Sequence, residues 1–130
     1  QAGLELRFDR IEPGMFTFDS GLAAGRNILA RADRPTAILA QNDDMAVGAM
    51  MAAREIGLSI PERLSVVGFD DSEVSRITWP RLTTVRQPVF EMAVAATEMV
   101  IAQLEDREPL ASVLHSHTLL VRESAAPPHA

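Results

Sequence analysis

The sequence contains no cysteine and no lysine, and each absence excludes a class of chemistry. Without cysteine there is no disulfide, no thiolate zinc site and no cysteine nucleophile. All twelve basic residues are arginines, which excludes a Schiff-base lysine and the lysine of a phosphate-binding loop. No apolar run approaches the ~20 residues that a membrane-spanning helix requires. From these absences we expect a folded domain without covalent cross-links or a membrane anchor.

The composition that remains is typical of one folded domain. The chain has 130 residues, of which 47% are apolar and 23% charged. It has neither an initiating methionine nor a secretory signal, so we expect Gln1 to open a fragment of a longer protein. The net charge is −6 and the arginines are scattered, so duplex DNA should repel this body. If the protein acts on DNA, another segment must hold the DNA.

Strand-like and helix-like segments alternate along the chain. The predicted strands are residues 5–11, 36–40, 64–69, 82–85 and 116–121, the second of them buried on both faces. Ser20 is predicted to cap a helix that runs to about residue 32, and Asn42 caps one that stops at Gly57. Pro88 suits the first turn of a long helix that ends near Leu104. This order predicts an α/β fold with a mostly parallel sheet and helices on both faces.

Polar residues follow three of the predicted strands, where ligands of such sheets usually bind. Asn42 follows the first of these strands, Asp70 the second and Gln87 the third. An amide both donates and accepts hydrogen bonds, and an ionised carboxylate only accepts them. Together the three side chains match a polyhydroxylated ligand. Asn42 can also cap the following helix, and the two roles are compatible.

Phe16 lies in a loop before the first helix and is a candidate stacking residue. Its ring could lie flat against the C–H face of a sugar or stack on a base. An ordinary core aromatic is an equally good interpretation, because phenylalanine is often buried.

Candidate catalytic groups are weaker. The pair Asp70 and Asp71 could be a phosphoacceptor or a phosphatase nucleophile, but no lysine is present to hold phosphate, and Asp71 is expected to serve a turn and a helix cap. His115 and His117 could start a metal site, but a third ligand is not evident and a solvated strand end is favoured. We therefore expect no enzyme, no catalytic residue, no metal and no cofactor.

Two helices are apolar on nearly every side, namely residues 45–56 and Val89–Leu104. A helix that covers a sheet needs only one apolar stripe, so the second apolar face requires another cover. One interpretation is a missing part of the same chain, and the other is a homodimer interface built on Met45, Met50 and Met51. Both remain open at this point.

Several ordered motifs resemble a known family. The runs are RPTAILAQNDDMAVGAMMAAREIGLSIPERLSVVGFDDS at 34–72, PRLTTVRQP at 80–88 and LLVRES at 119–124. They resemble the LacI/GalR family of bacterial transcriptional regulators over about residues 14–124. Periplasmic sugar-binding proteins share the fold, but the combination of PTAI, SVVGFDD and P-LTTV-QP is more similar to the repressors.

The resemblance implies a regulator with an N-terminal helix-turn-helix and a two-lobed effector domain similar to periplasmic binding proteins. Residues 1–124 would be the C-terminal lobe, followed by a loose tail at 125–130, and the N-terminal parts would be absent from this chain. Phe16 then matches an aromatic stacking position, and Asn42, Asp70 and Gln87 match polar effector contacts. The helix after Asp43 matches a dimer-contact element.

The function implied is that of a cytoplasmic sensor of a sugar or a related metabolite. The effector would close the cleft between the lobes and change operator affinity, and DNA would be contacted only through the absent N-terminal domain. The alternatives are a solute-binding protein of a sugar transporter and, less favoured, a magnesium-dependent phosphatase that uses Asp70.

Overall fold

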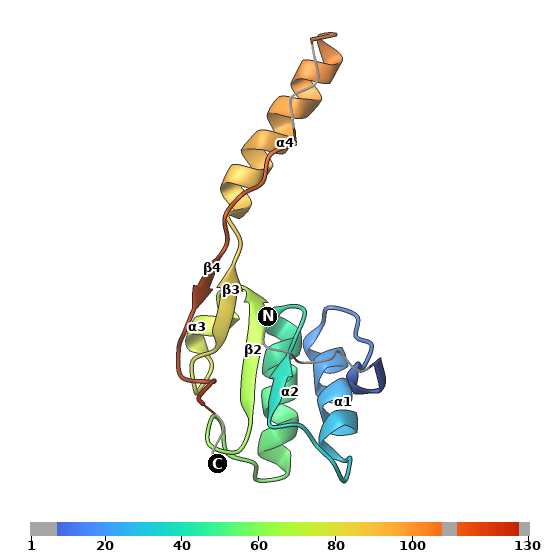
Figure 1. Ribbon diagram of the computed structural model, residues 1–130, viewed down its shortest axis with the longest axis vertical. Helices are drawn as coiled ribbons and strands as arrows, with labels where there is room; N and C mark the ends of the chain where they lie inside the picture. Colours follow the sequence, from blue (N-terminus) through green and yellow to red (C-terminus); the bar gives the residue numbers. More distant parts are fainter. Residues whose placement is uncertain (1–7, 108–111, 128–130) are drawn as a thin grey trace.

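The computed structural model describes residues 8–107 and 112–127 (Figure 1). Its elements are η1 (Phe8–Arg10), α1 (Phe18–Leu29), β1 (Ala37–Leu39), α2 (Asp43–Glu55), β2 (Ser65–Asp70), α3 (Val74–Ile77), β3 (Thr83–Arg86), α4 (Val89–Leu104) and β4 (Thr118–Leu120). The strands form one sheet in the order β1-β2-β3-β4. The first three strands are parallel, and β4 pairs antiparallel with β3. The predicted α/β class with a mostly parallel sheet is confirmed.

The core lies between α2 and one face of the sheet. Leu64, Val66 and Leu82 are completely buried there, together with the small side chains of α2. α1 packs on the outer side of α2, and the two helices approach closely at Gly48. A Cβ atom at Gly48 would lie only 2.3 Å from the carbonyl oxygen of Phe18. Glycine at this position is therefore a requirement of helix packing.

Hydrogen bonds at the helix starts show which residues act as caps. Asn42 caps α2 as predicted, because its Oδ1 accepts a hydrogen bond of 2.9 Å from the backbone N–H of Met45. The predicted cap of α1 is wrong by three residues. Thr17 is the N-cap, and Ser20 completes a capping box with it. This helix ends at Leu29, whereas α2 ends at Glu55 and is followed by Gly57 at φ 68°.

Two strand predictions fail. Within the predicted strand 5–11, Phe8–Arg10 forms a 3-10 helix, and residues 5–7 lie outside the described part of the chain. The prediction that residues 36–40 are buried on both faces is also wrong. Ile38 is buried against the helices, but Leu39, on the opposite face, is 69% exposed. The apolar run thus reflects a strand whose second face is left uncovered by the residues that the structure describes.

Helix α4 has the predicted bounds and projects away from the body along its longest dimension (Figure 1). Only Ala102 is buried among its residues, so large apolar side chains such as Phe90 and Leu104 are exposed. The segment that follows runs back beside the helix to β4 (Figure 1). Within residues 8–107 and 112–127, no helix is long and apolar enough to cross a membrane.

The C-terminal segment closes the sheet at the amino ends of β2 and β3. Ser124 is fully buried, where its hydroxyl donates a 2.6 Å hydrogen bond to the carbonyl of Val66 and accepts one of 2.8 Å from the N–H of Thr83. The predicted loose tail begins in contact with the body, because Ala126 exchanges hydrogen bonds with the hydroxyl of Ser65.

Candidate ligand-binding site

The parallel strands β1, β2 and β3 end at the same edge of the sheet, and the predicted ligand residues lie at or directly after those strand ends. Asp70 is the last residue of β2 and pairs in register with Arg86, the last residue of β3. Gln87 comes directly after β3, and Asn42 stands between β1 and α2. The three side chains that were predicted to bind a ligand therefore belong to one end of the sheet.

Phe16 and Asn42 form the first of two pairs. The Nδ2 of Asn42 donates a 3.0 Å hydrogen bond to the carbonyl of Phe16, while its Oδ1 caps α2. An amide has two N–H groups and two lone pairs, so Asn42 keeps one donor and one acceptor for another partner. The ring of Phe16 is 65% exposed, and the residue has φ 58°. The core-aromatic interpretation of Phe16 is therefore wrong.

Asp70 and Gln87 form the second pair. The Nε2 of Gln87 donates a 2.7 Å hydrogen bond to Oδ1 of Asp70, and both residues are half-buried. They line a hollow of about 390 Å³ together with Arg76, Arg86 and the start of α4. Phe16 and Asn42 lie outside this hollow, so the structure groups the four predicted residues as two pairs at one end of the sheet.

Asp71 lies in the turn after β2, as predicted, but it caps no helix, because the N-cap position of α3 is Glu73. Its side chain is only 2% exposed and binds three arginines. Arg86 and Arg76 donate hydrogen bonds of 2.7 and 2.8 Å to its Oδ2, and Arg122 donates to its Oδ1. Burial by itself would raise the pKa of Asp71, but the hydrogen bonds from the three arginines outweigh burial and hold that pKa well below its usual range.

Asp43 is a second buried carboxylate next to the site. Its Oδ1 accepts a 2.6 Å hydrogen bond from the hydroxyl of Thr84, and its Oδ2 accepts from the backbone N–H and the hydroxyl of Ser72. Gly68 of β2 lies against this carboxylate. A Cβ atom at Gly68 would lie 2.3 Å from Oδ1 of Asp43.

The histidines form no cluster with other ligating groups. His115 and His117 line a small hollow beside Phe69 and Val85. Within the part of the chain that the structure describes, no three side chains of histidine, cysteine, aspartate or glutamate could hold a metal ion together.

The three methionines that were predicted to form a dimer interface differ in exposure. Met45 and Met50 belong to the buried core, because the face of α2 that carries them packs on α1 and the sheet. Both side chains therefore have almost no surface to offer a partner, Met45 being 9% and Met50 5% exposed, contrary to the prediction for them. Met51 is 38% exposed.

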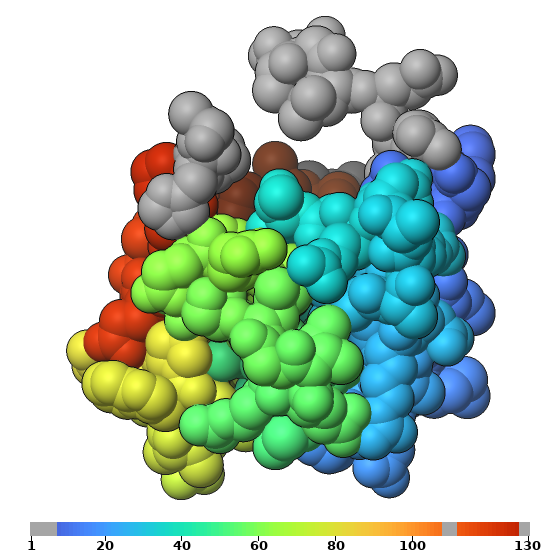
Figure 2. Space-filling model, turned by 90° about the horizontal axis from the view of Figure 1, so that it is seen from below, coloured from blue at the N-terminus to red at the C-terminus, as the bar shows by residue number. Residues whose placement is uncertain are grey.

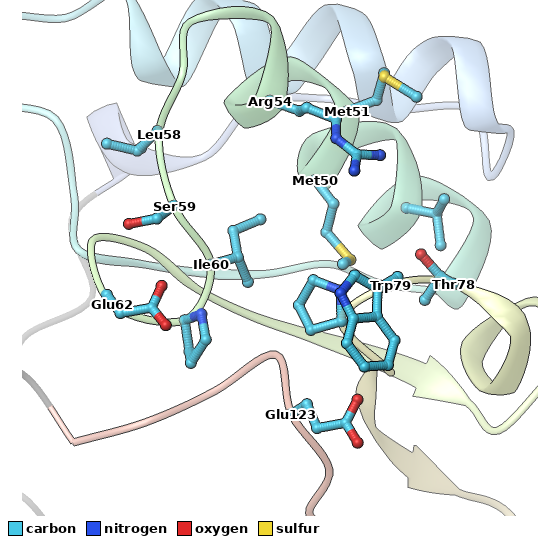
Figure 3. Close-up of a pocket in the computed structure, with 13 residues that line it drawn as sticks. Met50, Met51, Arg54, Leu58, Ser59, Ile60, Glu62, Thr78, Trp79 and Glu123 are labelled. Carbon is cyan, nitrogen blue, oxygen red and sulfur yellow. The ribbon is translucent and has the colours of Figure 1, made fainter.

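Met50 and Met51 do line a hollow with a volume of about 630 Å³. Its walls are α2, the segment around residue 60 and the segment around residue 80. The depression between these segments is visible in Figure 2. Met50 points from α2 toward the indole of Trp79 (Figure 3). Arg54, Glu62 and Glu123 supply charge at this mainly apolar surface.

Known proteins resemble the chain over most of its length. The family model described as periplasmic binding protein-like domain matches residues 2–125. The HTH-type transcriptional repressor PurR of Pectobacterium atrosepticum is 36% identical over 127 residues, which cover 97% of this chain and 37% of that protein.

Solved structures agree with this match. A LacI family transcriptional regulator from Mycobacterium smegmatis is similar with a TM-score of 0.89 and 33% identity, over 98% of this chain and 49% of that one. The transcriptional regulator CelR in its complex with cellobiose has a TM-score of 0.87 and 35% identity, over 95% of this chain and 38% of that one. The chain thus spans less than half of the length of these relatives.

Proposed function

Because this chain belongs to the LacI family of transcriptional regulators, we propose that it is the C-terminal lobe of an effector-binding domain that senses a small hydroxyl-rich molecule. The observation that carries this proposal is the position of Asn42, Asp70 and Gln87 at the carboxyl ends of three neighbouring parallel strands. This edge is where ligands bind in open α/β sheets.

The chemistry of these groups favours a sugar or a similar polyol. Asn42 and Gln87 both donate and accept hydrogen bonds, and Asp70 accepts them from hydroxyl groups. The exposed ring of Phe16 supplies an apolar surface for the C–H face of such a ligand. A related regulator has been solved in complex with cellobiose, a disaccharide, which supports the same ligand class.

The mechanism that we propose is closure of a cleft. In the full-length regulator a second lobe lies across the site, and it covers the apolar helix α4, which is exposed on nearly every side here. An effector that contacts both lobes favours the closed arrangement by its differential affinity. Coupling of this kind is typically ~1–3 kcal/mol per site, and it changes the affinity for operator DNA.

DNA contact belongs to another segment of the regulator. The net charge of −6 opposes DNA binding by this lobe, and several arginines are occupied by carboxylates within the fold. The relatives are transcriptional repressors, which favours this function over a transporter component or a phosphatase.

Asp70→Ala in the full-length regulator tests the sensor function. We expect the variant to lose its response to effector while keeping its affinity for operator DNA. Calorimetric titration with cellobiose and other hydroxyl-rich sugars measures the first property, and a DNA-binding assay measures the second. Glu62→Gln is the control, because it removes an exposed carboxylate from the opposite end of the strands. Unchanged effector affinity in Asp70→Ala would refute the assignment.

We further propose that the hollow beside α2 is the homodimer surface. Trp79 and Ile77 are largely exposed at or near it, together with Met51 and Ile56 of the α2 end. Exposed apolar groups of this extent usually mark contact surfaces.

Met51→Glu should convert the dimer to a monomer in sedimentation velocity, because it places a charge in that surface. The comparison uses the 130-residue chain, in which α4 is not covered by a second lobe. Val100→Glu on α4 is the matched control there, since Val100 is also an exposed apolar residue. If Val100→Glu dissociates the dimer and Met51→Glu does not, the interface lies on α4 and the assignment is wrong.

A further inference from the structure

Each predicted ligand residue at the strand ends has a chain neighbour in a buried polar network. The adjacent pairs are Asn42 with Asp43, Asp70 with Asp71, and Gln87 with Arg86. In each pair the first side chain is a predicted ligand group and the second makes hydrogen bonds that hold the fold, although Asp71 and Arg86 also line the hollow beside Asp70 and Gln87. The network therefore holds the backbone from which all three ligand groups extend.

Thr84 connects the carboxylate of Asp43 to the backbone of Asp71. Its hydroxyl donates a 2.6 Å hydrogen bond to Oδ1 of Asp43 and accepts one of 3.3 Å from the backbone N–H of Asp71. Thr84 is fully buried in β3, next to the strand that carries Asp70. One hydroxyl group thus joins the start of α2 to the turn after β2.

The turn after β2 depends on such contacts. Asp70 has φ 114° and Asp71 has φ 57°, a region that residues with side chains rarely occupy. Backbone of this kind persists where surrounding contacts hold it, and it is frequent at ligand sites. Here the contacts are the Thr84 hydroxyl on the backbone of Asp71 and the three arginines on its carboxylate.

The arginines extend the network to the connection with α4. Arg86 is the last residue of β3, before Gln87 and Pro88 lead into α4. Arg122 lies beyond the other end of β4, where it makes hydrogen bonds with Thr83 and Leu82 at the start of β3. Both bind the carboxylate of Asp71. The network therefore contacts the strand ends of the site, the chain passage into α4 and the segment after β4.

We propose that Thr84 and Asp71 are positioning residues, which fix Asn42, Asp70 and Gln87 in the geometry that receives the effector. They act through the backbone of the adjacent residues, and Thr84, which is completely buried, does not touch the ligand. The proposal rests on the proposed function for the identity of the site, but the geometry itself is testable without a ligand.

The first test observes the side-chain amide signals of Asn42 and Gln87 by ¹H–¹⁵N NMR in Thr84→Val. The variant keeps the shape of the side chain and removes the hydroxyl, so we expect both signals to shift or broaden. Thr84→Ser restores the hydroxyl and should restore both signals. Ser124→Ala is the matched control: it removes another buried hydroxyl with two hydrogen bonds, at the amino ends of the strands, and should leave both signals unchanged.

Arg86→Gln is a second variant that the fold should tolerate, because its side chain is half-exposed. It should shift the Gln87 signal more than the Asn42 signal. Unchanged Asn42 and Gln87 signals in folded Thr84→Val, or an unchanged Gln87 signal in Arg86→Gln, would overturn the proposal.

Titration of the full-length regulator with cellobiose separates this proposal from the proposed function. If the wild type binds, we expect Thr84→Val to weaken binding by roughly tenfold or more, with recovery in Thr84→Ser. Equal affinity of wild type and Thr84→Val would refute the positioning role. If no hydroxyl-rich sugar binds the wild type, the proposed function fails, while the NMR result still decides whether the network sets the geometry.

Discussion

Replacing Asp71 by asparagine should destabilise the fold strongly, because the change removes one charge and leaves three cations around an amide. Removing one partner of a buried ion pair typically costs ~3–5 kcal/mol, whereas an exposed pair contributes only ~0–1 kcal/mol. The side chains of Arg76 and Arg86 are 58% and 51% exposed and regain water easily, but that of Arg122 is 17% exposed. One largely buried pair and two exposed ones give an expected loss of about 3 kcal/mol.

Urea denaturation at neutral pH measures this loss in the 130-residue chain. With a slope of ~1–3 kcal/mol per molar urea, the midpoint of Asp71→Asn should fall by roughly 1–3 M. Glu123→Gln is the control, because it removes a carboxylate from the exposed pair with Arg81. Its cost should stay below about 1 kcal/mol.

The pH dependence supplies an independent check with a defined sign. The folded pKa of Asp71 lies below its unfolded value of about 3.9, so its contribution is fully present above the unfolded pKa and is lost as pH falls through the folded pKa. The difference in stability between wild type and Asp71→Asn should therefore be constant from about pH 5 to 8 and narrow below about pH 4. Two results would refute this account of the ion cluster. One is a shift of the urea midpoint in Asp71→Asn no larger than that in Glu123→Gln. The other is a stability difference between wild type and Asp71→Asn that does not narrow as the pH falls below about 4.

Two further substitutions test the packing that supports the site. Gly48→Ala should destabilise the chain by roughly 1–3 kcal/mol or more, because its Cβ would lie 2.3 Å from the Phe18 carbonyl oxygen; an unchanged melting temperature would show that α1 can move aside freely. Leu82→Ala removes a completely buried side chain and should cost ~2–5 kcal/mol in urea denaturation. A loss well under 1 kcal/mol would mean that the core collapses around the gap.

The parts of the fold that follow from local signals were predictable from the sequence. The bounds of α4 follow from Pro88 and a long apolar helical segment, and the cap of α2 follows from Asn42. The position of the three strand ends follows from short apolar runs, each followed by polar residues. Each of these sequence signals lies within a few residues of the helix or strand end that it predicts.

The errors concern features that depend on distant residues. Arg122 reaches Asp71 across 51 positions of sequence, so the ion cluster is invisible to local reasoning. The burial of Met45 depends on α1 packing over α2, which no periodicity of α2 alone reveals. Leu39 was predicted to be buried because it is apolar and lies in an apolar run. It is 69% exposed, because no residue in the described part of the chain covers that face of the strand.

The antiparallel pairing of β3 with β4 also has a practical consequence. Arg86 and Thr118 are partners in that ladder, so the two strands form a hairpin whose entire loop is residues 87–117. The apolar helix is thus an insertion into this hairpin, joined to the remainder of the molecule by two adjacent peptide strands. A short turn in place of the insertion would remove the exposed apolar helix and leave every hydrogen bond between β3 and β4 intact. Such a shortened chain is a natural starting point for crystallisation.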